Sequence, residues 1–262
     1  MPALFVGHGS PMYAIEPNIH TQAWVSLAKK IPKPTAIVMI SAHWLTRGIW
    51  ITAMDKPKTI HDFGGFPQTL FDIEYPAPGS PGLAQHIKGL LTPQFTNVTL
   101  EESEWGIDHG SWSVLKYMYP QADIPVIQMS IDASLTPDQH VALGRKLQIL
   151  RDENILIISS GNIVHNLQLI AWKNNIPTPP WSIQFNDFFK MHLLNNDLGP
   201  LIDWQSAGPD AQLAIPTPEH YLPALYTFGL KKPSESAYIF TDGIEMSSIS
   251  MLSFVYGMPS TQ

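Results

Sequence analysis

The stretch ALFVGHGSP, residues 3–11, joins a short apolar run to a loop that carries His8. An apolar run that stops at glycine and proline is typical of a buried strand that ends in a loop. The same pattern of a run followed by a histidine recurs twice, in TAIVMISAHW (residues 35–44, with His43) and after ILIISSGN (residues 155–162, with His165). In open α/β sheets, the loops after the carboxyl ends of strands form the ligand crevice. We therefore expect these three histidines to share one crevice.

Helical patterns alternate with the strands. A serine or threonine followed by proline opens two of the expected helices, because the side chain caps free amide groups and proline fits the first turn. Helices are expected at 24–28, 81–91, 137–150, 181–194 and from Pro218, and further strands at 49–53, 125–131, 237–240 and 251–256. This alternation predicts a single α/β domain over residues 1–262, with a central, largely parallel or mixed sheet flanked by helices and antiparallel strands at its end.

Composition excludes several classes of protein. The 262 residues contain 15 Lys and Arg against 22 Asp and Glu, so the net charge is 15 − 22 = −7, which disfavours nucleic-acid binding. Only 14% of the residues are charged and 44% are hydrophobic, so the chain can bury a large core. The sequence shows no signal-peptide pattern and no run long enough for a membrane span, which predicts a cytoplasmic protein without membrane contacts.

The chain has no cysteine and ten histidines. Without thiols, there can be no disulfide and no cysteine nucleophile, and any metal must be held by imidazole or oxygen. A single histidine is nevertheless more often a hydrogen-bonded structural or surface residue than a ligand. We assign that structural role to four histidines and leave His61 undecided; the four are His20, His86, His140 and His192.

Two further histidines stand beside carboxylates. Asp108 precedes His109 in a glycine-lined, aromatic segment that we expect to be a loop, and this setting suits a proton-transfer residue oriented by Asp108. Glu219 precedes His220 at an expected helix start, where either side chain could complete a metal site. The alternative is a helix-capping Glu219 and a packing His220.

Seven motifs taken together resemble one family. They are GHGSP (7–11), SAHW (41–44), DFGGFP (62–67), YPAPG (75–79), WGIDHG (105–110), SGN with His165-Asn166 (160–166) and PEHY (218–221). This set resembles the class III extradiol ring-cleavage dioxygenases, in the 4,5-DOPA dioxygenase branch. The resemblance extends over nearly the whole chain and implies one extradiol dioxygenase catalytic domain over residues 1–262, with a metal site at the carboxyl ends of the strands.

The resemblance also implies roles for five histidines. His8, His43 and His220 match metal ligands, His165 matches either a further ligand or the catalytic base, and His109 matches the second acid/base residue. The wider superfamily uses two histidines and a glutamate on Fe(II). A histidine-only site departs from that pattern and also suits zinc, so we expect Fe(II) for ring cleavage and find Zn(II) plausible in the purified protein.

The implied reaction opens a catechol such as L-DOPA with O2, by 4,5-cleavage, to a muconate semialdehyde. Four aromatic residues either line a flat slot for the ring or belong to the core: Trp44, Phe63, Phe66 and Tyr221. The partners would be the catechol and O2, in a monomer or small homo-oligomer. Two other functions stay open: a zinc hydrolase, in which the metal lowers the pKa of a bound water, and a non-catalytic metal-binding module. A serine hydrolase is disfavoured because Pro11 follows Ser10, which leaves no nucleophile elbow.

Overall fold

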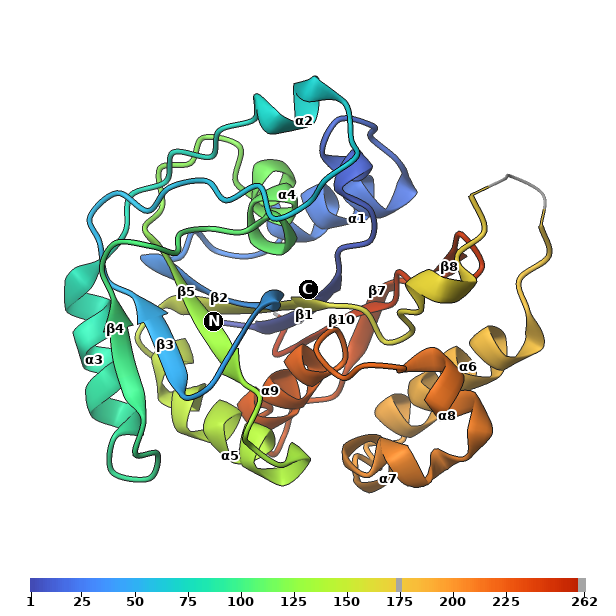
Figure 1. Ribbon diagram of the computed structural model, residues 1–262. Coiled ribbons are helices and arrows are strands. Elements are labelled where there is room, and N and C mark those ends of the chain that lie inside the picture. The colour runs from blue at the N-terminus through green and yellow to red at the C-terminus, as the bar shows by residue number, and fades with distance from the viewer. Residues whose placement is uncertain (173–175, 259–262) are drawn as a thin grey trace.

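The computed structural model describes residues 1–172 and 176–258. Within these residues, eight strands form one sheet in the order β4-β3-β5-β2-β6-β1-β10-β7 (Figure 1). The strands are β1 Ala3–Gly7, β2 Ala36–Thr46, β3 Ile49–Thr52, β4 Val98–Glu101, β5 Val126–Asp132, β6 Ile155–Gly161, β7 Tyr238–Thr241 and β10 Ser253–Tyr256. A small separate hairpin pairs β8 (Ile244–Glu245) with β9 (Ile249–Ser250).

The centre of the sheet is parallel. Strands β5, β2, β6 and β1 are parallel neighbours, whereas β3 is antiparallel to β5, and β10 is antiparallel to β1 and β7. The parallel strands are buried on both faces, which explains their continuous apolar sequences. In β6, for example, Ile155 and Ile157 enter one core cluster while Leu156 and Ile158 enter the other. The predicted single α/β domain with a largely parallel or mixed sheet is confirmed.

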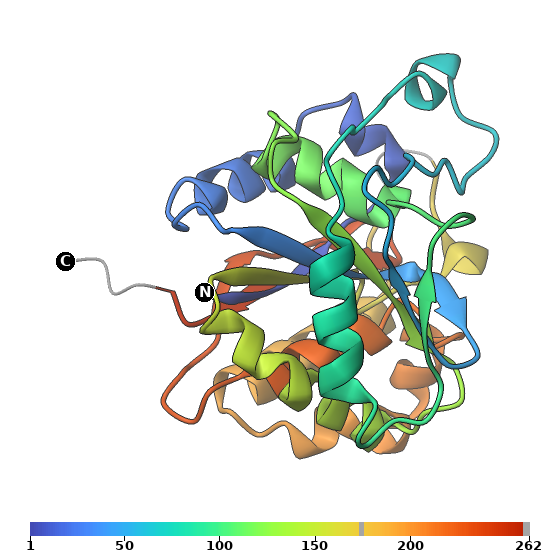
Figure 2. The ribbon, with the colours of Figure 1, turned by 90° about the vertical axis from the view of Figure 1, so that its left-hand side faces the viewer.

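Helices cover both faces of this sheet (Figures 1 and 2). Helices α1 and α4 pack on one face, and α3, α5, α6 and α9 pack on the other. The helices are α1 Ile19–Ala28, α2 Gln68–Phe71, α3 Pro81–Leu91, α4 His109–Met118, α5 Pro137–Leu147, α6 Pro180–Leu194, α7 Gly199–Ile202, α8 Pro209–Ala214 and α9 Leu222–Leu230, with short 3-10 segments at Pro11–Ala14, Gln148–Arg151, Leu167–Leu169 and Trp204–Ala207. In the described part of the chain, no helix is both long and apolar enough to cross a membrane.

The expected helix starts are confirmed at two places and shifted at a third. The side chain of Ser80 caps α3, and Thr136 caps α5 in a reciprocal capping box. The helix expected from Pro218 begins four residues later, at Leu222, because residues 218–221 form a turn in which the Tyr221 amide donates to the Pro218 carbonyl at 2.9 Å. This turn carries His220.

Two differences from the expected elements concern site residues. Strand β2 does not end before His43 but continues to Thr46, and its register against β5 shifts between Ile40 and Leu45. His43 therefore lies in an irregular part inside a strand. His109 was expected in a loop but is the first residue of α4. The sequence of this helix, HGSWSVLKYM, contains one glycine, two serines and two aromatic residues, which are poor helix formers, so burial rather than intrinsic propensity stabilises it.

Candidate metal centre

Three histidines from distant parts of the chain meet at the carboxyl edge of the parallel strands. His8 directly follows β1, His43 lies in the irregular part of β2, and His220 lies in the turn before α9. The last residue of β6, Gly161, lets this turn approach the sheet: the Asn162 amide donates to the His220 carbonyl at 2.8 Å, and a Cβ on Gly161 would lie 2.2 Å from that oxygen. Glycine is therefore required for this close approach.

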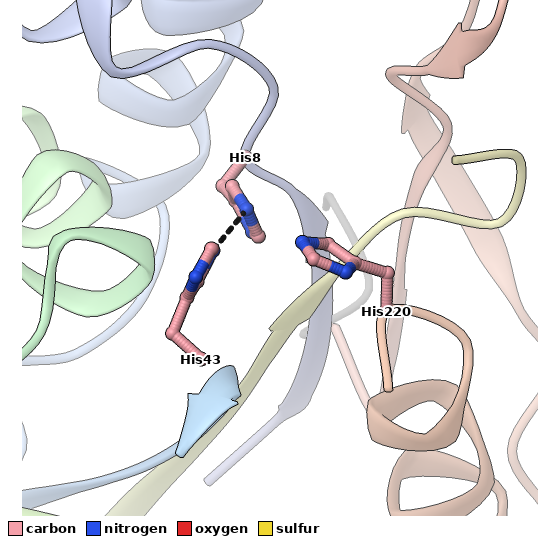
Figure 3. A group of neighbouring side chains, drawn as sticks. All are labelled: His8, His43 and His220. Carbon is pink, nitrogen blue, oxygen red and sulfur yellow. Dashed lines mark hydrogen bonds between the residues drawn. The ribbon is translucent and has the colours of Figure 1, made fainter. Parts of the chain in front are cut away.

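The three imidazoles point toward one another (Figure 3). One possible ligand atom from each residue can be chosen so that all lie within 4.8 Å of one another, and the Nε2 atoms of His8 and His43 are 3.0 Å apart. His8 and His220 are buried, and His43 is partly buried. Imidazole is a common ligand of zinc and of non-haem iron.

Polar contacts at the outer nitrogens assign the tautomers of His8 and His43. The Ser160 hydroxyl donates to the carbonyl of Gly110 at 2.5 Å, so it must accept from His8 Nδ1 at 3.0 Å. The Asp62 carboxylate can only accept, and its Oδ2 lies 3.1 Å from His43 Nδ1, so the ring proton of His43 is on Nδ1, beside the carboxylate. Both Nε2 atoms then carry lone pairs that face each other. Only a cation between them, a proton or a metal ion, makes this contact favourable.

The ionisation of these residues agrees with a cation site. Burial, reinforced by the neighbouring imidazoles, lowers the pKa of His8 and of His220 well below the usual value, so both are neutral, the form that binds metals. Burial also opposes charge on His43, but the hydrogen bond to Asp62 and the nearby carboxylates outweigh it and raise the pKa of His43. Among the residues that the structure describes, the buried Nδ1 of His220 has no hydrogen-bond partner, since Glu219 Oε1 lies at 3.6 Å. The donor set fits Fe(II) or Zn(II).

His109 is held by Asp62, not by Asp108 as expected from the sequence. Its Nδ1 donates to Asp62 Oδ2 at 2.9 Å, and its backbone amide donates to Asp62 Oδ1 at 3.0 Å. Burial, followed by the charge of His43, lowers the pKa of His109 to about 4. Asp62 stays ionised although it is largely buried, because its hydrogen bonds with His109 and His43 lower its pKa.

Asp108 instead has a structural role. Its Oδ1 accepts from the Ser111 amide at 3.1 Å and so caps α4, while its other oxygen accepts from the Gln128 side chain. It is fully buried, and this burial raises its pKa to about 6. Asp108, the neighbour of His109 in the sequence, therefore caps the helix, whereas Asp62, 47 residues before His109, orients the imidazole.

His165 lies beside this group. Its ring stacks on that of His220, with centroids 3.5 Å apart and planes 8° apart, and its backbone amide donates to the Ala214 carbonyl at 2.9 Å. It forms a further possible ligand group with Glu219 and His220, and His109 forms another with His43 and Asp62. Burial, followed by the charge of His43, lowers the pKa of His165 to about 4. Its role as a ligand or as a base stays a prediction.

All five histidines line one cavity of about 330 Å³. Of the four aromatic residues considered for a substrate slot, Phe63 and Phe66 line this cavity. Trp44 instead stacks on Trp105, with centroids 5.6 Å apart, and Tyr221 is buried in the core, where its hydroxyl donates to a backbone carbonyl. Apolar wall residues that sequence reasoning missed are Leu167, Ile170, Trp172, Met246 and Ile249. No motif marks them, because their positions depend on how the β8–β9 hairpin and the segment after His165 fold together.

The remaining histidines have other partners. His20 Nε2 contacts Glu245 Oε1 at 3.1 Å, and a ring nitrogen of His61 contacts the Ile73 carbonyl at 2.9 Å. His86 contacts Glu153, His140 contacts the Tyr226 hydroxyl, and His192 contacts Asp197. The structural role expected for four of them agrees with these contacts, and the undecided His61 joins them.

Comparisons with known proteins agree with this site. A family model described as the catalytic LigB subunit of aromatic ring-opening dioxygenase matches residues 2–255. The chain is 50% identical over 260 residues to a 4,5-DOPA dioxygenase extradiol of Escherichia coli (strain K12), covering 98% of this chain and 95% of that protein. It is 37% identical over 233 residues to a protein of the same name from Beta vulgaris, covering 86% and 85%.

A solved structure is also similar over the whole chain. The crystal structure of an uncharacterized protein from Escherichia coli K12 matches with a TM-score of 0.86 and 46% sequence identity, covering 98% of this chain and 100% of that one. The resemblance inferred from the seven motifs is thereby confirmed. This chain belongs to the LigB family of aromatic ring-opening dioxygenases.

Proposed function

We propose that residues 1–262 form one catalytic domain, a metal-dependent extradiol dioxygenase that opens the ring of a catechol such as L-DOPA by 4,5-cleavage to a muconate semialdehyde. The observation that carries this proposal is the convergence, in one cavity, of facing Nε2 lone pairs on His8 and His43 with the carboxylate-held imidazole of His109. The relatives named 4,5-DOPA dioxygenase extradiol support the same reaction. A cytoplasmic location and a monomer or small homo-oligomer belong to this proposal.

The metal would be held by His8, His43 and His220. A divalent ion bound there supplies a common centre for the catechol oxygens and O2 and stabilises negative charge on the diol. Cleavage with O2 requires a redox-active ion, so we propose Fe(II) as the working metal. Zn(II) suits the same imidazoles but has no redox chemistry.

The protein's own groups would move the protons. At neutral pH, His109 is neutral because its pKa is about 4, so its Nε2 can accept a proton from a catechol hydroxyl and return it later. His165 lines the same cavity, stacked on His220, and is the second proton acceptor or a conditional fourth ligand. Phe63 packs edge-on against His109 with centroids 5.3 Å apart, which limits water around that imidazole.

A second cavity supports a catechol with an amine on its side chain. This cavity, of about 480 Å³, shares Ser10, Phe66, Trp172 and Met246 with the first. It also carries the carboxylates of Glu16 and Glu245. A substrate whose ring occupies the first cavity could extend an ammonium group toward these carboxylates, as the α-ammonium of L-DOPA would.

The decisive experiment is anaerobic reconstitution with Fe(II), followed by addition of catechol and air. We expect O2 uptake with L-DOPA and a product whose mass equals substrate plus O2. The zinc-loaded protein is the control and should consume no O2. A fully iron-loaded protein that consumes no O2 with L-DOPA, dopamine or 3,4-dihydroxyphenylpropanoate would contradict the proposal. Ester hydrolysis by the zinc form, in that case, would favour the hydrolase.

A further inference from the structure

One carboxylate oxygen of Asp62 serves two imidazoles. Oδ2 lies 3.1 Å from His43 Nδ1 and accepts from His109 Nδ1 at 2.9 Å, and Oδ1 accepts from the His109 amide at 3.0 Å. The two imidazoles lie close together, with ring centroids 3.9 Å apart. The Asp62 side chain is 14% exposed, so water competes little for these contacts. Asp62 thus contacts one proposed metal ligand and one proposed proton-transfer residue at once.

This arrangement has a chemical consequence. An ionised carboxylate has no proton to donate, so in both contacts the proton must be on the Nδ1 atom of the imidazole. Each imidazole is then left with its lone pair on Nε2. That of His43 faces His8, and that of His109 belongs to a ring that lines the cavity.

We propose that Asp62 is a positioning residue that acts through both imidazoles. It sets the tautomer and ring orientation of His43 for metal binding and those of His109 for proton transfer. The part that concerns proton transfer rests on the proposed function; the part that concerns tautomers and metal binding does not. Asp62 stands in the DFGGFP segment, residues 62–67, whose Phe63 and Phe66 line the same cavity.

Ser160 provides a matched contrast. It orients His8 in the same way, through Nδ1 at 3.0 Å, with its own proton committed to the Gly110 carbonyl. In the described structure, however, it hydrogen-bonds only one imidazole of the site. Ser160→Ala therefore removes support from a proposed ligand and leaves His109 with Asp62, whereas Asp62→Asn affects both.

The first test reads the tautomers in the metal-free protein. Long-range ¹H–¹⁵N NMR of histidine side chains distinguishes a proton on Nδ1 from one on Nε2, with signals assigned from His43→Gln and His109→Gln. At pH 7.5, we expect His109 to carry its proton on Nδ1, and His43 to carry one on Nδ1 whether or not Nε2 is also protonated. In Asp62→Asn, the amide offers one acceptor and two donors, so at least one ring should change its pattern. Wild-type rings without Nδ1 protons, or unchanged signals in Asp62→Asn, would overturn the proposal.

The second test separates metal binding from turnover. By competition with a chelator, Zn(II) affinity should fall about 10- to 100-fold in both Asp62→Asn and Ser160→Ala, the usual effect of losing a partner behind a ligand. At saturating Fe(II), kcat should fall at least about tenfold further in Asp62→Asn than in Ser160→Ala. In a His109→Gln background, Asp62→Asn should lower kcat little more, because its effect acts through His109.

Two outcomes would contradict this part of the proposal. One is an undiminished metal affinity in Asp62→Asn. The other is a double variant whose fold-loss in kcat equals the product of the losses in Asp62→Asn and His109→Gln. If Asp62→Asn does not fold, Asp62→Glu keeps the carboxylate but displaces it, and the wild-type tautomers still test the assignment. Correct tautomers and reduced Zn(II) affinity, in a protein that cleaves no catechol, would refute the proposed function and leave the positioning role intact.

Discussion

The cavity lined by five histidines and the core around His140 both bury imidazoles, but they differ in what surrounds the rings. His140 lies in α5, is fully buried, and contacts the Tyr226 hydroxyl of α9 through Nδ1 at 3.0 Å. Burial lowers its pKa to about 4, the same value as that of His109. A buried histidine with a low pKa therefore does not by itself identify a functional site.

The cavity differs from the surroundings of His140 because several imidazoles and a carboxylate meet in it. Five imidazoles line it, His8 and His43 face each other through Nε2 at 3.0 Å, and the ionised Asp62 holds two of the rings. Among the residues that the structure describes, the His140 ring contacts the Tyr226 hydroxyl and ring, and no second imidazole lies beside it. Lone pairs that meet require a cation, whereas a lone ring beside a tyrosine requires only packing. Of four predictions in decreasing order of expected effect, three test this distinction, and the fourth tests how the neighbouring cavity of Glu245 extends the site.

The largest effect should follow from removing a ligand. His8→Ala leaves at most two of the three facing imidazoles, so bound Fe(II) should fall below about a tenth of an ion per chain and ring cleavage by at least about 1000-fold. His140→Gln, the matched control, should retain its metal. Metal analysis after dialysis measures both, and an unchanged metal content in His8→Ala would remove the ligand assignment.

The second effect concerns proton transfer. His109→Ala should lower kcat by about 10²- to 10⁴-fold, the usual contribution of a positioned acid or base. Its metal content should stay close to that of the wild type, because His109 is not one of the three facing imidazoles. Single-turnover kinetics with loaded Fe(II) gives the rate. Loss of metal without loss of rate per bound iron would place His109 among the ligands instead.

The third effect concerns stability and acts at His140. The pKa of this residue is about 4 in the folded protein and about 6.5 when unfolded, so the unfolded chain binds more protons between those values. Above pH 6.5 His140 is neutral in both states and does not reduce the free energy of unfolding. As the pH falls toward 4, the unfolded chain takes up the proton first, and the free energy of unfolding falls by up to about 3 kcal/mol. His140→Gln removes this titration. Urea unfolding of the metal-free proteins from pH 7.5 to 4.5 should show a shallower pH dependence for the variant, and parallel curves would contradict the assignment.

The smallest effect tests the second cavity. Glu245→Gln keeps a side chain that can contact His20 but removes a negative charge. We expect KM for L-DOPA and dopamine to rise about two- to fivefold, the scale of one partly exposed ion pair. KM for 3,4-dihydroxyphenylpropanoate, which lacks an ammonium group, should not rise. An equal change for all three catechols would show that Glu245 does not recognise the amine.

The sequence predicted the elements that local chemistry determines. Apolar runs marked the parallel strands, and Ser80 and Thr136 marked two helix starts, because these signals act within a few residues. The five histidines of the cavity also came from the sequence, although their grouping followed from family motifs and from the rule that strand ends share an edge.

Long-range contacts escaped prediction. Nothing near His109 shows that Asp62, and not the adjacent Asp108, would reach its ring. The irregularity that places His43 inside β2 depends on the register with β5, which no local pattern encodes. Trp44 and Phe63 were equal candidates for the cavity wall, and only the packing of the folded chain separates them.

The position of β1 in the sheet has a consequence for the order of folding. This strand lies between β6 and β10, and its Ala3 pairs with Tyr256, so one of its neighbours is made near the end of synthesis. His8 leaves the ribosome early but meets His220 only after some two hundred further residues have followed. Such distant pairing is slow compared with local folding. Until His220 has been made, the nascent chain lacks one of the three imidazoles, so the proposed metal centre can be assembled only once almost the whole protein has been translated.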